Sequence, residues 1–306
     1  MAIRIAVLGG TGMLGSMLVN YLRSVPDIKL VATTRSFDCE VKDNVTWTFL
    51  DAEHASPSDI NNAISGAEVV VNAIGVIKPM INEQDDASVH RALNVNACFP
   101  HLLAVLGGDG VHIIQPSTDC VFSGMAGPYY EDSDPDPVDL YGKSKSRGEP
   151  VGENVLVTRC SLIGPEQGAG RSLMSWFLAR KRNEQVRGFN SHYWNGVTTL
   201  HYAKLVESMA RFWPGDGVHH IVPADSVTKY ELLGLFARHF GLDDITIESA
   251  SAGYCDRRLS SQDSRWNDRL WRNAGWTTPP FINEMIYDLK IYMSSGRYGI
   301  LKHGVN

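Results

Sequence analysis

Six apolar runs of strand length recur in the first half of the chain, and segments long enough for helices separate them. The runs cover residues 3–8, 28–34, 45–50, 67–74, 111–117 and 154–162. This alternation is typical of a parallel sheet with helices on both faces, because each crossover between parallel strands needs a helix-length connection. Six repeats in about 160 residues predict an α/β fold with a doubly wound, Rossmann-type parallel sheet.

The second half of the chain follows a looser pattern. Crossover helices are expected at 13–23, 87–106 and 141–149 in the first half. After about residue 165, helical segments are predicted at 172–182, 201–213, 229–241 and 281–293, with short strand-like pieces at 219–223 and 245–249. We therefore expect residues 165–306 to form a smaller C-terminal α/β lobe.

Composition and charge exclude several classes of partner. Of the 306 residues, 43% are hydrophobic, which is enough for a sizeable core. The net charge of -6 gives no general attraction to nucleic acid phosphates or to anionic membranes. The chain has no run of about 18 uncharged apolar residues and no leader pattern at its N-terminus. We expect a cytoplasmic protein with neither nucleic acid nor membrane as a partner.

The cysteines are odd in number and far apart, with no C-x-x-C pair, so we interpret them as reduced thiols. They are Cys39, Cys98, Cys120, Cys160 and Cys255. The sequence has no H-E-x-x-H motif and no cluster of Cys and His residues. We therefore expect no metal site.

The first apolar run leads directly into GGTGMLG, in which Gly9, Gly12 and Gly15 are spaced as G-x-x-G-x-x-G. Such glycines permit a tight turn and a close approach of the backbone to a pyrophosphate, while the following helix presents free N–H groups. A merely flexible turn would also contain glycines. Because strand, glycine turn and helix occur in this order, we predict a dinucleotide site.

The end of the second strand indicates which dinucleotide binds. It reads Thr33, Thr34, Arg35, and residues 28–37 contain no acidic side chain. An acidic residue there would bind the ribose 2′-hydroxyl of NAD, whereas an arginine can pair with the 2′-phosphate of NADP. The alternative is that Arg35 is a solvated surface charge. We predict NADP(H) as the cofactor, with NADPH preferred over NADH, and Asp51 as the acceptor for the adenine amine.

The segment YGKSK places the Tyr141 phenol and the Lys145 amine on one face of a predicted helix, because they are four residues apart. Ordinary surface pairs often have this spacing. In a doubly wound sheet, however, ligands bind beyond the carboxyl ends of the strands. Ser117, Thr118 and Asp119 lie at the end of the fifth strand, so we predict that they face the same cleft as Tyr141 and Lys145.

Together these motifs resemble those of the extended short-chain dehydrogenase/reductase family. GGTGMLG, Asp51, VNAIG, LNVNA with Asn96, STDCVF and YGKSK occur in that family's order. Within the family, the chain is most similar to the dTDP-4-dehydrorhamnose reductase group, because STDCVFSG resembles its S-T-D-x-V-F-x-G motif. Two positions differ: Cys120 stands where this group usually has Tyr, and Leu162 stands where many members have a substrate-contacting Trp.

The resemblance implies reduction of the 4-keto group of a nucleotide-linked deoxy sugar. Residues 1–164 would form the NADP-binding domain that carries the catalytic residues. Residues 165–306 would mainly bind substrate, with segments exchanged between the lobes. Tyr141 would donate the proton and Thr118 would hydrogen-bond the ketone oxygen. Lys145 would bring the phenol pKa closer to neutrality and would hold the nicotinamide ribose.

The resemblance also implies binding residues. The cofactor contacts would be Gly9, Thr11, Gly12, Met13, Leu14, Gly15, Arg35, Asp51, Ala52, Ala73, Ile74, Gly75, Asn96, Tyr141 and Lys145. The substrate contacts would be Thr118, Asp119, Leu162 and Arg257. Asn96 could instead be structural. Arg258 and the cluster at 180–182 are alternatives to Arg257 for a substrate pyrophosphate.

Other functions stay open at this point. One is a sugar-nucleotide epimerase of the same family. Another is a noncatalytic NADP-binding regulatory subunit, because a relative of this group is the regulatory partner of methionine adenosyltransferase. A homodimer is also open. Dehydratases of the family follow the Asp of S-T-D with Glu, but here Cys120 follows Asp119, so we expect no elimination of water.

Overall fold

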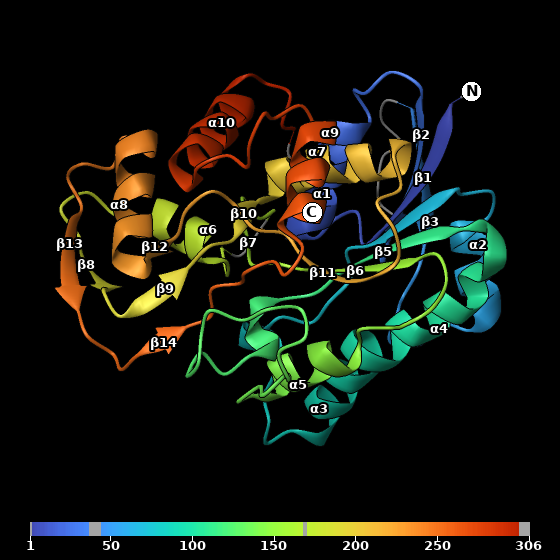
Figure 1. Cartoon of the computed structure of the whole chain (residues 1–306), viewed down its shortest axis with the longest axis horizontal. Helices are drawn as coiled ribbons and strands as arrows, with labels where there is room; N and C mark the ends of the chain where they lie inside the picture. Colours follow the sequence, from blue (N-terminus) through green and yellow to red (C-terminus); the bar gives the residue numbers. More distant parts are fainter. Residues whose placement is uncertain (1, 37–43, 168–169, 300–306) are drawn as a thin grey trace.

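The computed structural model describes residues 2–36, 44–167 and 170–299, so Cys39 lies outside the described residues. Within these ranges, the centre is a sheet of seven parallel strands in the order β11-β6-β5-β4-β1-β2-β3 (Figure 1). The strands are β1 (Ile3–Leu8), β2 (Ile28–Thr34), β3 (Val45–Phe49), β4 (Val69–Asn72), β5 (His112–Pro116), β6 (Val155–Arg159) and β11 (Gly217–His220). This order confirms the predicted doubly wound fold.

Strand β11 corrects one expectation. The sequence pattern predicts six strands in the main sheet and leaves the piece at 219–223 in the second lobe. Instead, β11 pairs with β6 in parallel, from Gly217 beside Leu156 to His220 beside Arg159. All five residues of β6 are buried, so the backbone groups on its outer edge need a partner strand. The proposed boundary between residues 164 and 165 stays a prediction.

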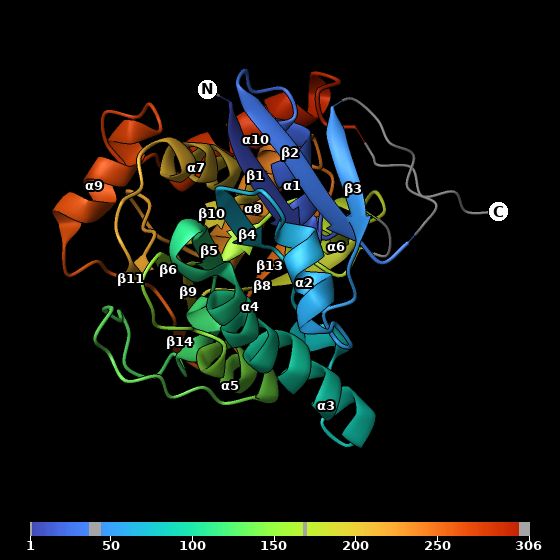
Figure 2. The same cartoon turned by 90° about the vertical axis from the view of Figure 1, so that its right-hand side faces the viewer.

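Helices cover both faces of the sheet (Figure 2). Alternate residues of β1 enter different cores: Ile5 and Val7 belong to one cluster, and Ala6 and Leu8 to another. One face carries α1 (Met13–Leu22) and α7 (Thr199–Arg211). The other face carries α2 (Pro57–Ile64), α3 (Asp86–Leu93), α4 (Phe99–Gly107) and α5 (Leu140–Arg147). Burial on both faces explains why these strands read as continuous apolar runs.

The second lobe lies at the far end of the molecule from β3 (Figure 1). Its helices are α6 (Leu173–Leu178), α8 (Lys229–Phe240) and α10 (Ile282–Ser294), and α9 (Ser264–Asn273) packs against α7. Its short strands are β7 (Leu162–Ile163) with β10 (Val197–Thr198), β8 (Gln185–Phe189) with β13 (Thr246–Ala250), and β9 (His192–Trp194) between β12 (Val227–Thr228) and β14 (Cys255–Asp256). One core cluster contains Met17 of α1, Phe236 of α8 and Met285 of α10, so the lobe packs directly on the sheet domain.

The single helix predicted at 87–106 is divided into α3 and α4 by a π-helical turn at Asn94–Cys98. Asn96 in this turn is buried, and its Nδ2 donates to the Val76 carbonyl at 2.9 Å. Its Oδ1 accepts a hydrogen bond from the Val76 amide at 2.8 Å. A π turn widens the helix locally and is often associated with such a fixed side chain. Helical periodicity in the sequence gives no signal for it.

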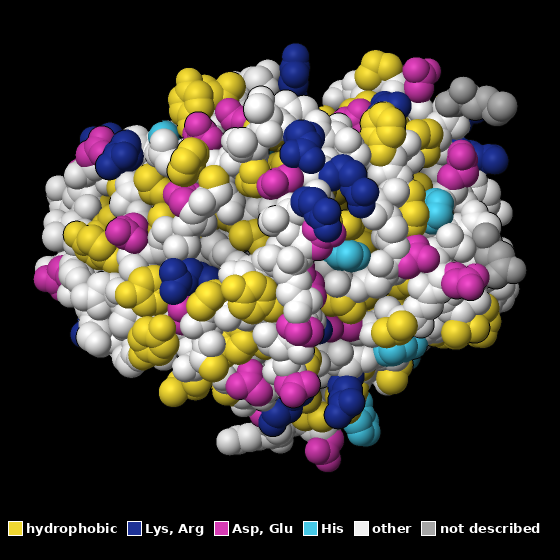
Figure 3. Space-filling model, in the orientation of Figure 1, with side chains coloured by type: hydrophobic (Ala, Val, Ile, Leu, Met, Phe, Trp, Pro, Cys, Tyr) yellow, Lys and Arg dark blue, Asp and Glu magenta, His cyan; other side chains and the backbone are white. Residues whose placement is uncertain are grey.

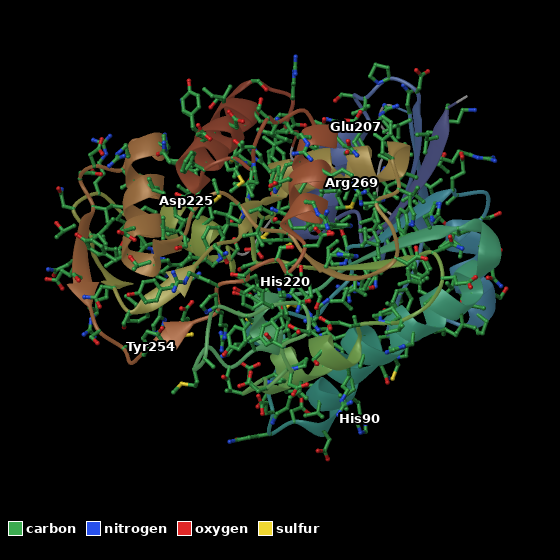
Figure 4. The ribbon with its side chains drawn as sticks, viewed as in Figure 1. His90, Glu207, His220, Asp225, Tyr254 and Arg269 are labelled. Atoms are coloured by element: carbon green, nitrogen blue, oxygen red, sulfur yellow. The ribbon has the colours of Figure 1, made fainter. Side chains whose placement is uncertain are left out.

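The surface carries charges of both signs. On the face in Figure 3 they are intermixed, with a group of Lys and Arg side chains over α9 that includes Arg269, labelled in Figure 4. Among the described residues, no helix is both long enough and apolar enough to cross a membrane.

Two glycines allow α5 to lie against neighbouring backbone. A Cβ on Gly142 would lie 2.2 Å from the Cys120 carbonyl oxygen, and a Cβ on Gly148 would lie 1.8 Å from the Asn96 carbonyl oxygen. Both distances are far below van der Waals contact, and backbone atoms cannot move aside cheaply. The helix that carries Tyr141 and Lys145 can therefore occupy this place only with glycine at both positions.

We predict that Gly148→Ala lowers the free energy of unfolding by about 1–3 kcal/mol or more, because the added methyl overpacks a backbone contact. Gly234→Ala is the matched control. Gly234 lies inside α8, and a Cβ there would meet nothing within 4 Å. That change should raise stability by roughly 0.5–1 kcal/mol. Urea denaturation measures both, and equal effects of the two variants would contradict the close packing of α5.

Candidate active site

A cleft of about 390 Å³ lies beyond the carboxyl ends of β1, β2 and β4. The predicted cofactor contacts that line it are Gly9, Thr11, Gly12, Met13, Arg35, Asp51, Ala52, Ala73, Ile74 and Gly75. Two other predicted contacts lie behind its wall: Leu14 is buried in the core, and Gly15 packs under the glycine loop. The cleft therefore follows the edge of the sheet at which a doubly wound fold binds its ligand.

Each glycine of the loop has a different physical role. Gly9 has φ 79°, in the left-handed region that favours glycine. A Cβ on Gly15 would lie 2.0 Å from the Gly9 carbonyl oxygen, so only glycine lets α1 approach the loop. At Gly12 the nearest atom to a Cβ would be 3.5 Å away, so the protein itself leaves room there.

The first turn of α1 fits a phosphate group. Gly12 is the N-cap of this helix, and no side chain caps it. The first amides of the helix therefore point into the cleft with the positive end of the helix dipole. A side chain at position 12 would occupy the space in front of them. These features fit the pyrophosphate of a dinucleotide.

Charged side chains of both signs gather at the other end of the cleft. The Asp51 carboxylate accepts a hydrogen bond from His54 Nδ1 at 2.9 Å and from the Glu53 amide at 3.3 Å. Burial raises the pKa of Asp51, but these hydrogen bonds, together with His54 and Arg35 nearby, hold it below its ordinary value. Arg91 pairs with Glu53 at 2.9 Å and lines the same cleft. The sequence analysis missed Glu53 and Arg91.

Thr118 and Tyr141 meet beyond β5. Thr118 precedes a 3₁₀ turn (Asp119–Val121), and its Oγ1 accepts a hydrogen bond from the Cys120 amide at 3.1 Å. The Thr118 hydroxyl donates to the Asp119 carboxylate at 3.1 Å, and the same side chain lies close enough to the Tyr141 phenol to lower its pKa. Burial raises the pKa of Tyr141 well above its ordinary value of 10.0. Desolvation is the larger effect here, so the phenol holds its proton at neutral pH. The lowering expected from Lys145 and the charge of an oxidised nicotinamide stays a prediction.

Lys145 is buried on the same helix. Its Nζ donates to the Pro116 carbonyl at 2.8 Å, at the end of β5. Burial lowers the pKa of Lys145 from 10.5 to about 8, while the Glu149 carboxylate opposes this shift. The end of β5, next to Thr118, therefore fixes the position of the amine.

Asn96 links the cofactor cleft to the catalytic helix. Besides its two bonds to Val76, its Nδ2 lies 3.1 Å from the Ser144 Oγ on α5. Val76 lines the cleft, so one buried amide connects the cleft wall with the helix that carries Tyr141. Asn96 therefore contacts other protein groups and does not line the cleft.

The predicted substrate residues are divided between two places. Arg257 lies beside the catalytic turn: its Nε donates to the Phe122 carbonyl at 2.9 Å, and its Nη1 lies 3.8 Å from the Cys120 Sγ. Asp119 is buried next to Thr118. Leu162 lies on β7, half-buried against the core.

Two of the alternative cations for a pyrophosphate have carboxylate partners elsewhere. Arg258 pairs with Asp256 at 2.6 Å. Arg180 pairs with Glu184 at 2.9 Å and stacks over Trp176. Within the described ranges, no group of three His, Cys, Asp or Glu side chains could hold a metal ion.

Lys229 is a candidate that the sequence analysis missed. It begins α8, and its Nζ lies 5.3 Å from the centre of the Trp194 ring. Burial lowers its pKa, while Asp119 and the thiol of Cys120 oppose this. Lys229 also lines a second cavity of about 680 Å³, together with Trp176, Arg187 and Phe189. It therefore lies between the catalytic turn and a cavity in the second lobe.

Comparisons with known proteins identify the family of this chain. The model of the family described as RmlD substrate binding domain matches residues 3–288. The chain belongs to this family. Its members are similar to the dTDP-4-dehydrorhamnose reductase group of extended short-chain dehydrogenases/reductases, as the motifs predict.

Individual relatives fall into two groups. A dTDP-4-keto-6-deoxy-D-glucose reductase of Streptomyces niveus is 26% identical over 285 residues, which cover 89% of this chain and 93% of the relative. Methionine adenosyltransferase 2 subunit beta of Xenopus laevis is 40% identical over 215 residues, 66% of this chain and 62% of that relative's length. The structure of a dTDP-4-dehydrorhamnose reductase from Bacillus anthracis in complex with NADP shares the fold, with a TM-score of 0.73 at 18% identity, over 95% of this chain and 99% of that one.

Of the site residues that were missed, some could have been found from the sequence and others could not. Glu53 follows Asp51 at the end of the third strand, so its place at the cleft could have been inferred from the strand ends. Arg171 and Gln167 also line the cleft, but they follow β7, where no motif is evident. Lys229 reads only as the first residue of a helix. Its burial depends on how the second lobe packs, which the sequence does not reveal.

We predict that Lys145→Met stabilises this RmlD-family chain at pH 7 by about 1–3 kcal/mol. The native pKa lies below the unfolded one, so between pH 8 and 10.5 the unfolded state binds more protons than the native state. The cost of burying the amine is therefore complete below about pH 8 and disappears toward pH 10.5. Urea denaturation of both proteins at pH 7 and 10 measures this. A gain that does not shrink with rising pH would contradict the assigned burial.

Proposed function

We propose that the chain is an NADPH-dependent oxidoreductase that reduces the 4-keto group of a nucleotide-linked deoxy sugar. The observation that carries this proposal is the proximity of the Thr118 side chain to the Tyr141 phenol, with Lys145 held on the same helix at the end of β5. The relative from Streptomyces niveus, named for reduction of a dTDP-4-keto-6-deoxy sugar, supports the same substrate class.

The residues divide the chemistry among them. The nicotinamide coenzyme supplies the hydride when bound. Thr118 hydrogen-bonds the ketone oxygen, and the protonated Tyr141 gives its proton to that oxygen as negative charge develops there. A phenol with a raised pKa holds its proton at neutral pH, which suits a donor. Lys145 would hold the nicotinamide ribose, and its positive charge would stabilise the phenolate that remains after the proton transfer.

The cleft residues would hold the coenzyme. The glycine loop and the first turn of α1 would bind the pyrophosphate, and Asp51 the adenine end. Arg35 would pair with a 2′-phosphate, which is the basis for preferring NADPH over NADH. Arg91 adds a second positive charge to the same wall but is paired with Glu53.

The substrate would extend from the catalytic turn into the second lobe. Asp119 and Arg257 would contact the sugar, and Leu162 would lie near it. The cavity of about 680 Å³ would take the nucleotide, since Trp176 and Phe189 offer ring faces for a base. Residues 1–164 would thus mainly serve the coenzyme, and residues 165–306 the substrate.

Elimination of water fits this site poorly. Burial, reinforced by the charge of Asp119, raises the pKa of the Cys120 thiol to about 12. A thiol that keeps its proton at neutral pH cannot act as the base of a dehydratase. The coenzyme would therefore be consumed in each turnover instead of being regenerated.

A second candidate function is a subunit that binds a methionine adenosyltransferase. The observation that favours it is the 40% identity to a relative named as subunit beta of that enzyme. This chain spans 62% of that relative's length. A noncatalytic subunit would still bind a dinucleotide but would not oxidise it.

One experiment separates the candidates. Purified protein is mixed with NADPH and, one at a time, a panel of nucleotide-linked 4-keto-6-deoxy sugars, and NADPH loss and product mass are followed. Reduction gives one NADPH consumed for each sugar that gains two hydrogens. An epimerase would change the sugar with no net loss of NADPH. Tight NADPH binding with no turnover on any sugar would favour the subunit.

We predict that Tyr141→Phe lowers turnover by at least ~100-fold, the range expected when a general acid is removed. NADPH affinity should stay within a few-fold, because the ring is kept. Tyr202→Phe is the matched control: its hydroxyl is also buried and bonds Thr158, away from the cleft. Turnover rates of both variants decide this, and comparable losses would show that the phenol of Tyr141 has only a structural role.

We predict that Arg35→Asp erases or reverses the preference for NADPH, because it removes the partner of the 2′-phosphate and adds repulsion. Arg265→Asp on the exposed face of α9 makes the same change in charge far from the cleft and should leave the preference unaltered. The ratio of KM values for NADPH and NADH is the measurement. Equal KM values in the unmodified protein would refute the role of Arg35.

A further inference from the structure

A buried ion pair lies directly behind the catalytic residues. The Glu149 carboxylate accepts hydrogen bonds from Arg159 Nη2 at 2.7 Å and Nε at 3.0 Å. Both side chains are only 6% exposed. Ser117 donates a third hydrogen bond to the same carboxylate. Neither charge faces the cofactor cleft, so the proposed reaction does not use them directly.

This carboxylate connects the two segments that carry the catalytic groups. Glu149 lies two residues beyond the end of α5, and its carboxylate acts on the Lys145 amine, four residues earlier in the chain. Ser117, its hydrogen-bond donor, directly precedes Thr118. Pro116, one residue earlier, accepts the hydrogen bond from the Lys145 amine. The end of β5 and the end of α5 are thus joined through Glu149.

Few polar or ionisable groups face Lys145. Tyr141 lies on its own helix, the Pro116 carbonyl on β5, and Cys160 beyond β6. Burial raises the pKa of Cys160, so this thiol is neutral at physiological pH. Within the described part of the chain, Glu149 is then the one anion that acts on the buried Lys145. An unpaired ammonium in such a place tends to lose its proton.

A nearby half-buried carboxylate, Glu131, has other partners. Glu131 accepts hydrogen bonds from the His220 amide at 3.1 Å and the Gln262 amide at 2.8 Å. His220 lies near the middle of the view in Figure 4, at the end of β11. Arg159 touches this group only through the Glu131 backbone carbonyl. Glu131 therefore offers a matched comparison for Glu149.

We propose that Glu149 is a positioning residue for the reduction: it keeps the Lys145 amine charged and fixes the Ser117–Thr118 turn against α5. The inference rests on the proposed function for its catalytic meaning. The effect of the buried Glu149 carboxylate on the buried Lys145 amine can be measured without any turnover.

The direct test is NMR titration of protein labelled with [¹³Cε]lysine, with the Lys145 signal assigned from its loss in Lys145→Met. In the unmodified chain we expect a midpoint near 8. Glu149→Gln should move this midpoint down by about one unit or more, because a neutral amide no longer stabilises the ammonium. Glu131→Gln should leave it in place, although both variants lose a carboxylate.

Glu149→Gln leaves Arg159 buried without its partner and can fail to fold. The double variant Glu149→Gln with Arg159→Gln removes both charges, so no unpaired ion remains. The midpoint should still fall in the double variant, because the carboxylate that stabilises the ammonium is absent there too. An unchanged midpoint in a folded variant, single or double, would overturn the proposal.

Turnover supplies the functional readout. In Glu149→Gln we expect the alkaline limb of the kcat profile to move to lower pH together with the NMR midpoint, whereas Glu131→Gln keeps the original limb. A midpoint that falls while the kcat profile stays in place would overturn the positioning role. If the unmodified chain reduces none of the sugars, the proposed function fails, but the NMR titration still decides the Glu149–Lys145 coupling.

Discussion

The active-site geometry depends on one steric constraint: no side chain fits between α5 and the backbone segments on either side of it. Gly142 lies against the Cys120 carbonyl and Gly148 against the Asn96 carbonyl. This contact places the Tyr141 phenol near Thr118 and the Lys145 amine at the end of β5. The phenol, the hydroxyl and the amine are thus positioned by backbone packing, which is stiffer than a surface loop could be.

Such close packing also removes water, and burial sets the protonation state of each group. Desolvation raises the pKa of Tyr141 and lowers that of Lys145. The phenol thus keeps its proton, while the Glu149 carboxylate behind the amine opposes the loss of its charge. Arg159 in turn holds Glu149, which makes a short chain of alternating charges through the interior. Each member would be costly alone, and together they satisfy one another's hydrogen bonds.

Sequence reasoning could predict most of this fold, because strands buried on both faces read as continuous apolar runs. It located the cleft through Gly9, Gly12 and Gly15, whose spacing follows from phosphate geometry. It did not predict where β11 pairs, because four residues with two histidines carry no sign of sheet membership. It also missed Lys229, whose lowered pKa depends on desolvation, which only the packed structure determines. The π turn at Asn94–Cys98 was missed for a related reason, since it follows from a tertiary contact with Val76.

The cost of burying Lys145 bears on the choice between a catalyst and a scaffold. A chain that only has to fold and bind a partner gains nothing from an amine whose burial lowers its pKa from 10.5 to about 8. An apolar side chain of similar length would fill the same space and would leave no charge to compensate. An unfavourable burial of this kind is retained at sites where the chemistry requires it. One arrangement is formed by the buried lysine, the carboxylate behind it and the protonated phenol beside Thr118. A reduction reaction explains why the chain carries the stability cost of this arrangement, whereas a purely structural role does not.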